Sequence, residues 1–126
     1  MKKVLLADAD PINIEVLGAA LMGEGYRITS AGTLDQWNRI VHEKSFHLIL
    51  MDESFLSISK HLFSLSKEAF QPFEKTPLIV MTEYPELAEY GYKFPKRAKF
   101  LLKPFQAGEM FSLIRQIFFE ESVAVA

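Results

Sequence analysis

The stretch that decides the fold is residues 47–52, HLILMD, in which an apolar run ends in an acid. The same pattern occurs near the start of the chain, where residues 4–7 (VLLA) are followed by Asp8. A continuous apolar run of this length, without polar alternation, is typical of a strand buried on both faces of a parallel sheet. Both segments are therefore predicted to be central strands, each with an acid at its carboxyl end.

Three further segments have the composition of strands. They are residues 26–31 (YRITSA), 78–81 (LIVM) and 99–102 (KFLL). The first is less apolar than the others, so we expect it near an edge of the sheet. With the two central strands, the chain has five predicted strands, all short and separated by longer segments.

Helices are predicted between the strands, because apolar residues recur there three and four positions apart. The first has Asp10 to cap it, Pro11 at its first position and Gly25 near its end. The predicted helices cover residues 11–25, 33–41, 59–70, 85–92 and 107–121. Strands alternating with helices predict an α/β fold, in which helices cover both faces of a parallel sheet.

The composition fits one folded domain without disulfides. The 126 residues carry 14 Lys and Arg against 16 Asp and Glu, a net charge of −2, and no Cys. This balance gives no basic surface for nucleic acid, and the lack of Cys excludes thiolate zinc sites and Cys nucleophiles. No apolar stretch approaches the roughly 18–20 residues that span a membrane. We expect a cytoplasmic domain over residues 1–121, with a short tail at 122–126 and no nucleic-acid or membrane partner.

Polar residues follow the apolar runs of four predicted strands. They are Asp8, Asp52, Thr82 and Lys103. Parallel strands joined by right-handed crossovers end at the same edge, so these side chains are expected to meet in one shallow pocket. Two neighbouring carboxylates repel, and a cation with oxygen ligands, such as Mg²⁺, relieves the repulsion. The positive charge of a nearby lysine suits a substrate that carries the negative charge of a phosphoryl group. Singly, Asp52 and Lys103 could form a structural ion pair, but together the four residues indicate phosphoryl chemistry on an aspartate.

With these motifs in place, the sequence resembles the receiver domain of response regulators in two-component signalling. The resemblance spans the chain, through VLLADADP, GYRITSAG, LILMD, LIVMT and FLLKPF. It implies the CheY-like, flavodoxin-like fold, a doubly wound three-layer αβα sandwich with a five-stranded parallel sheet in the order 2-1-3-4-5. It also implies a cis peptide bond between Lys103 and Pro104.

The resemblance assigns a role to each residue of the pocket. Asp52 would accept a phosphoryl group from a sensor histidine kinase or a phosphotransfer protein. Lys103 would contact that group, Thr82 would be the switch hydroxyl, and Phe100 would occupy the aromatic switch position. The domain would then signal to a downstream effector by a conformational change. It would not be an enzyme, apart from self-catalysed transfer to Asp52 and hydrolysis from it.

The expected metal site departs from the family pattern. Receivers have two adjacent acids after the first strand, and here the second of them is Ala9. Mg²⁺ would be held by Asp8, Asp52 and the carbonyl of Ser54. We expect it to bind weakly, because affinity for a hard cation depends on the charge and number of its ligands. Glu83, in place of a small residue after the switch threonine, would add charge at the mouth of the pocket.

Two other interpretations stay open. The loss of an acid at Ala9 favours a pseudo-receiver, which binds its partner without phosphorylation. In either case the apolar residues of the last helix could form a partner or homodimer surface. Alternatively, the Asp8–Asp10 run is similar to the start of haloacid dehalogenase phosphatases, with Asp8 as nucleophile and Asp10 as acid/base. That reading gives Asp52 no role and lacks the later acids that would hold the metal.

Overall fold

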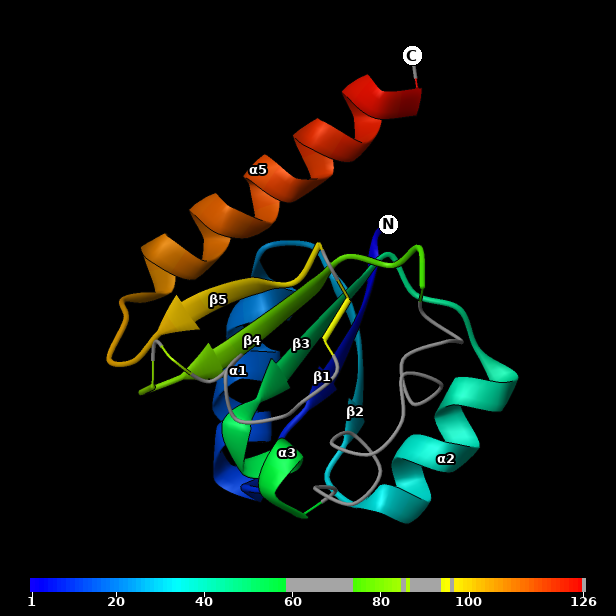
Figure 1. The fold of residues 1–126 in the computed structure, drawn as a ribbon, viewed down its shortest axis with the longest axis vertical. Coiled ribbons are helices and arrows are strands. Elements are labelled where there is room, and N and C mark those ends of the chain that lie inside the picture. Colours follow the sequence, from blue (N-terminus) through cyan, green and yellow to red (C-terminus); the bar gives the residue numbers. More distant parts are fainter. Residues whose placement is uncertain (59–73, 85, 87–93, 96, 126) are drawn as a thin grey trace.

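The structure is a computed structural model that describes residues 1–58, 74–84, 86, 94–95 and 97–125. Five strands form one sheet in the order β2-β1-β3-β4-β5, and every neighbouring pair is parallel (Figure 1). The strands are β1 (Lys3–Ala7), β2 (Arg27–Ala31), β3 (Leu48–Asp52), β4 (Leu78–Thr82) and β5 (Lys99–Leu102). The predicted sheet and strand order are confirmed, and β2 lies at an edge as expected.

The apolar runs form the strands at the centre of the sheet. Every residue of β3 and of β4 is buried, whereas the edge strands β2 and β5 are partly exposed. Alternate residues of a strand point to opposite faces. Leu48 and Leu50 accordingly belong to one core cluster, and Ile49 and Met51 belong to the other. The core therefore has two halves, one on each face of the sheet.

Helices cover both faces (Figure 1). They are α1 (Pro11–Gly23), α2 (Leu34–Glu43), α3 (Glu53–Ile58) and α5 (Ala107–Val125). Leu21 of α1 and Ile114 of α5 share one core cluster, whereas Trp37 of α2 and Phe55 of α3 share the other. This is the three-layer arrangement that the alternation of strands and helices predicts.

The predicted starts of the first two helices are confirmed by their caps. The Asp10 side chain accepts a hydrogen bond from the backbone N–H of Ile12 at 2.9 Å, and Thr33 Oγ1 accepts one from the N–H of Gln36 at 3.2 Å. The first helix ends at Gly23, and Gly25, which was predicted at its end, follows the cap residue Glu24 with φ +93°. That backbone conformation favours glycine, and the N–H groups of Gly25 and Tyr26 donate to the carbonyls of Met22 and Leu21, so Gly25 closes the end of α1 as predicted.

Other element boundaries differ from the predictions. Helix α3 was not predicted, because the chain was expected to be irregular from Ser54 onward. The α5 helix continues to Val125 instead of ending at residue 121. The helix predicted over 59–70 lies outside the described residues, as does that over 85–92 except for Glu86. Within the part of the chain that the structure describes, no helix is both long and apolar enough to cross a bilayer.

Candidate functional site

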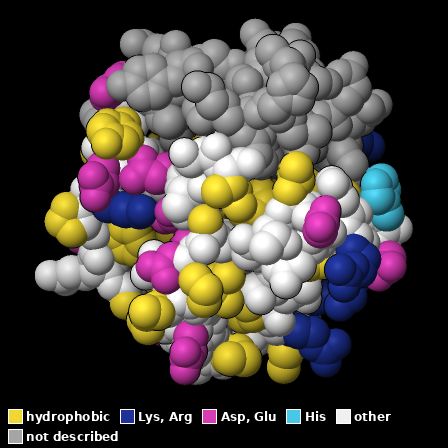
Figure 2. All heavy atoms as spheres, turned by 90° about the horizontal axis from the view of Figure 1, so that it is seen from below, with side chains coloured by type: hydrophobic (Ala, Val, Ile, Leu, Met, Phe, Trp, Pro, Cys, Tyr) yellow, Lys and Arg dark blue, Asp and Glu magenta, His cyan; other side chains and the backbone are white. Residues whose placement is uncertain are grey.

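The polar residues at the carboxyl ends of the strands meet at one edge of the sheet. Asp52 and Thr82 are the last residues of β3 and β4, and Asp8 directly follows β1. These three are the buried polar or charged residues among those described, with exposures of 0% for Asp8, 3% for Asp52 and 0% for Thr82. Burying such groups is costly unless they are paired. Figure 2 shows acidic and basic side chains gathered on the face seen from below.

Lys103 supplies the counter-charge for this edge. Its Nζ lies 2.7 Å from Asp52 Oδ1, so the predicted contact between these two side chains is confirmed. Partial burial by itself lowers the pKa of Lys103. The hydrogen bond to Asp52 and the charges of Asp52, Glu53 and Asp8 outweigh that effect and raise the pKa above its usual value. Lys103 is therefore a cation held among three carboxylates, and its peptide bond to Pro104 is cis, as expected.

Asp8 is the least satisfied of the acids. Its Oδ1 accepts hydrogen bonds from the N–H of Asp10 at 2.9 Å and from the Ser54 hydroxyl at 3.0 Å, but its buried Oδ2 has no hydrogen-bond partner among the residues that the structure describes. Burial raises the pKa of Asp8, and the charge of Asp52 raises it further. The hydrogen bonds from Asp10 and Ser54 oppose this rise only in part. An unpartnered oxygen beside a second carboxylate fits a cation ligand.

Ser54 connects the ends of β1 and β3 through contacts that the sequence did not indicate. Its hydroxyl donates to Asp8 and accepts from the N–H of Ala9 at 3.2 Å. Its backbone N–H donates to Asp52 Oδ2 at 3.0 Å and fixes the orientation of that carboxylate. Only the Ser54 carbonyl was predicted to contribute. The available signal was a hydroxyl two residues after the strand-end acid.

Glu53 also belongs to this site, although the sequence pattern did not indicate it. It begins α3 directly after Asp52, and its Oε2 accepts a hydrogen bond from the Thr82 hydroxyl at 2.8 Å. Its Oε1 lies 3.6 Å from Lys103 Nζ and accepts a longer bond, at 3.4 Å, from the N–H of Glu83. Thr82 was predicted as the switch hydroxyl, without a contact to Glu53. The signal for this contact was the adjacent acidic pair Asp52-Glu53.

The donor set fits magnesium, with few protein ligands. Carboxylate oxygens are ligands that Mg²⁺ accepts, and it usually keeps several waters. Asp8 and Asp52 provide two carboxylates, and Asp8 Oδ2 has no other partner. Among the described residues, no group of three or more His, Cys, Asp or Glu side chains is placed to hold a metal ion. The residues present thus suit a cation that is held mostly by water.

The two remaining predicted residues lie at the margins of the site. Phe100, in β5, packs edge-on against Phe94 with ring centroids 5.4 Å apart and an interplanar angle of 86°. It also packs against the core cluster that contains Trp37 and Phe55. The Glu83 residue is exposed. No observation tests the switching role predicted for Phe100 or the effect of the Glu83 charge.

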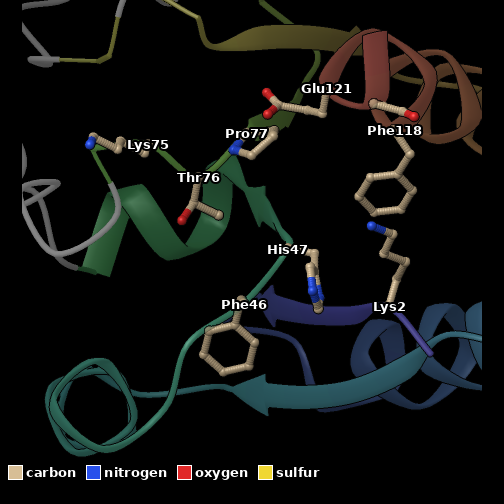
Figure 3. A pocket seen from close by; sticks show the side chains of 9 residues that line it. Lys2, Phe46, His47, Lys75, Thr76, Pro77, Phe118 and Glu121 are labelled. Atoms are coloured by element: carbon tan, nitrogen blue, oxygen red, sulfur yellow. The ribbon is translucent and has the colours of Figure 1, made fainter. Parts of the chain in front are cut away.

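A separate cavity of about 460 Å³ lies at the opposite edge of the sheet, where the strands begin (Figure 3). Lys2 points toward Phe118 there, with its Nζ 5.3 Å from the ring centroid. His47 also lines this cavity, and its Nδ1 accepts a hydrogen bond from the N–H of Lys3 at 2.9 Å. Burial and the positive charges of Lys2, Lys3 and the N-terminus lower the pKa of His47. None of these residues belongs to the pocket formed by Asp8, Asp52, Thr82 and Lys103.

Solved structures of receiver domains resemble the chain over almost its full length. A CheY-like receiver domain protein from Methanospirillum hungatei JF-1 matches with a TM-score of 0.80 at 20% identity, covering 98% of both chains. A receiver domain protein from Clostridium thermocellum matches with a TM-score of 0.76 at 18% identity, covering 98% of this chain and 99% of the other. This chain has the receiver-domain fold. No protein-family model and no curated protein sequence matches it.

A third receiver domain is relevant to the metal. It belongs to a sensor histidine kinase of Pseudomonas aeruginosa PAO1, and its structure has a magnesium ion coordinated in the active-site cleft. The TM-score is 0.68 at 21% identity, over 91% of this chain and 95% of that one. In the receiver fold the strand order reverses between β1 and β3. Ligands of such sheets bind at that reversal, and here Asp8 and Asp52 lie on either side of it.

Proposed function

We propose that this chain is a response-regulator receiver, which accepts a phosphoryl group on Asp52 and signals by a conformational switch. One observation carries the proposal: the Lys103 ammonium lies 2.7 Å from the carboxylate of a nearly buried aspartate at the carboxyl edge of the sheet. Ammonium and carboxylate groups at this position suit a ligand with phosphoryl charge. The receiver fold supports the proposal.

The chemistry follows from the contacts of Asp52. A carboxylate oxygen attacks the phosphorus of a phosphohistidine, the P–N bond breaks, and the imidazole leaves with its electron pair and takes a proton from water. The N–H of Ser54 holds Asp52 Oδ2 in place for this attack. Lys103 then neutralises one phosphoryl oxygen, and the Thr82 hydroxyl donates to another. The movement of Thr82 would draw the chain after β4 inward and leave space for Phe100 to rotate.

Magnesium fits this site through Asp8, Asp52 and the carbonyl of Ser54. When bound, it would offset the negative charge of the carboxylates and of the incoming phosphoryl group. We propose that it binds weakly, because Ala9 removes one carboxylate ligand. The unpartnered Asp8 Oδ2 supports a role for a cation.

The proposed partners follow from this chemistry. The donor would be a sensor histidine kinase or a phosphotransfer protein, and the recipient of the signal would be an effector protein or domain. We place the reaction in the cytoplasm and the receiver in residues 1–121, with a C-terminal extension at 122–126 whose residues 122–125 continue α5. A homodimer through apolar residues of α5 is compatible with this function. Catalysis would be limited to transfer to Asp52 and hydrolysis from it.

A pseudo-receiver is the second candidate, and specific contacts favour it. The Ser54 hydroxyl bridges Asp8 and the N–H of Ala9, while Glu53 occupies the Thr82 hydroxyl. These contacts satisfy much of the pocket without a phosphoryl group. The phosphatase alternative is not supported, because Lys103 pairs with Asp52 instead of Asp8. In addition, the carboxylate of Asp10 is used to cap α1.

Intact-protein mass spectrometry tests the two candidates. The protein is incubated with acetyl phosphate and Mg²⁺, and the Asp52→Asn variant is treated identically. A receiver gains the mass of one phosphoryl group, whereas Asp52→Asn gains none. The Ala9→Asp variant should be phosphorylated faster, because it regains the missing ligand. If neither the natural protein nor Ala9→Asp gains mass from any phosphodonor, the pseudo-receiver is correct.

A further inference from the structure

Glu53 accepts the one hydrogen bond that the Thr82 hydroxyl would otherwise donate to a phosphoryl group. The Thr82 hydroxyl has one proton, which it donates to Glu53 Oε2 at 2.8 Å. The same hydroxyl oxygen accepts a hydrogen bond from the N–H of Tyr84 at 2.9 Å. Thr82 is fully buried, so bulk water does not replace Glu53 as the hydrogen-bond acceptor of its hydroxyl. To donate to a phosphoryl oxygen, it has to release Glu53.

The charge of Glu53 acts at the same place. Its Oε1 lies 3.6 Å from Lys103 Nζ, and the side chain is only 20% exposed. Lys103 is thereby shared between Glu53 and Asp52, whose Oδ1 lies at 2.7 Å. A phosphoryl group on Asp52 would bring further negative charge to this ammonium. At such distances and partial burial, repulsion between like charges is weakly screened.

We infer that Glu53 is an internal substitute for the phosphoryl group. Its carboxylate holds the Thr82 hydroxyl and shares Lys103 before any phosphoryl group arrives, so the end of β4 is already anchored toward the pocket. The phosphoryl group competes with Glu53 for both partners. Glu53 is thus a positioning residue that weakens phosphorylation of Asp52. The competition rests on the function proposed above, whereas the anchoring of Thr82 does not.

The anchoring is tested without a phosphodonor, by amide hydrogen exchange measured by NMR. The Tyr84 amide reports on Thr82, because it donates to the Thr82 hydroxyl. Glu53→Ala should speed its exchange about tenfold, the scale of losing one charge-assisted hydrogen bond. Glu53→Gln keeps an acceptor and should largely retain the protection. The matched control is Glu43→Gln, which neutralises an exposed acid of α2 and should leave the exchange rate unchanged.

The competition is tested with beryllofluoride and Mg²⁺, using beryllofluoride as a probe for the phosphoryl group. Glu53→Gln should bind it about tenfold more tightly than the natural protein, because one repelling charge is removed. Glu43→Gln, which removes an exposed charge of α2, should change the affinity less than about twofold. Asp52→Asn should abolish binding.

The outcomes separate this inference from the proposed function. Equal Tyr84 exchange in the natural protein and Glu53→Ala overturns the anchoring. Unchanged beryllofluoride affinity in Glu53→Gln, with binding abolished by Asp52→Asn, overturns the competition but leaves phosphorylation of Asp52 standing. If no variant binds beryllofluoride while Glu53→Ala speeds Tyr84 exchange, the proposed function fails and the anchoring is supported.

Discussion

Removal of the Lys103 charge should destabilise the fold more than most substitutions at a partly exposed position. Lys103→Met keeps an unbranched side chain of similar length but leaves the Asp52 carboxylate, which is 4% exposed, without its partner at 2.7 Å. It also removes the cation nearest to Glu53, at 3.6 Å. The carboxylates of the pocket then repel one another without compensation.

The size of this effect follows from the burial of the two partners. Removing one member of a fully buried ion pair costs about 3–5 kcal/mol. The Lys103 side chain is 25% exposed, so water screens part of the interaction. We therefore expect Lys103→Met to lower the free energy of unfolding by about 2–3 kcal/mol at pH 7.

Urea unfolding, followed by circular dichroism, measures this loss. The matched control is the double variant Asp52→Asn with Lys103→Met, which should lose only about 1 kcal/mol, because a neutral amide needs no counter-charge. The pKa of Lys103 is raised in the folded protein. The stabilisation by its charge is therefore complete below pH 10.5, the ordinary pKa of lysine, and is lost as the pH rises through the pKa of Lys103 in the folded protein. A Lys103→Met protein within about 0.5 kcal/mol of the natural one, or a double variant as unstable as the single, refutes the reasoning.

Three further predictions concern Asp8, Ala9 and Gly25. Asp8→Asn should raise the free energy of unfolding at pH 7 by about 1 kcal/mol, since it removes a buried charge with an unpartnered oxygen. The pKa of Asp8 is raised, so the free energy of unfolding of the natural protein falls as the pH rises through that pKa, and the advantage of Asp8→Asn disappears in acid. Urea titrations from about pH 4 to 7 measure this. A difference in the free energy of unfolding between the two proteins that stays constant over this range contradicts it. Ala9→Asp should strengthen Mg²⁺ binding about tenfold, because a carboxylate ligand is added, and calorimetry measures the affinity. An unchanged affinity would contradict the explanation that Ala9 weakens the metal site. Gly25→Ala should cost about 1 kcal/mol because of its φ of +93°, whereas Gly23→Ala should not destabilise; equal effects in thermal unfolding would contradict the conformational argument.

The fold was predictable because a strand that is buried on both faces of a sheet has a continuous apolar sequence. The runs at 48–51 and 78–81 contain no polar residue, and both became fully buried central strands. Strand ends then placed Asp52, Thr82 and Lys103 together without further information. The helix at 53–58 left no comparable mark, because a six-residue helix is too short for a periodic apolar pattern.

The finer chemistry of the pocket depended on that short helix. Helix α3 begins directly at Glu53, which turns the Glu53 carboxylate toward Thr82 and the Ser54 hydroxyl toward Asp8. From the sequence alone, Glu53 next to Asp52 could equally be a solvated surface residue. The predicted weakness of Mg²⁺ binding and the switching role of Phe100 stay predictions, since both concern states with a metal or a phosphoryl group.

Chemical mapping of the acceptor distinguishes Asp52 from the other two carboxylates near Lys103, those of Asp8 and Glu53. After incubation with acetyl phosphate and Mg²⁺, borohydride reduces an aspartyl phosphate to homoserine and releases phosphate. Peptide mass spectrometry then locates the altered residue. We expect homoserine at position 52 and no reduction at Asp8 or Glu53. Reduction at Asp8 or Glu53, or no reduction at any of the three, would contradict this expectation.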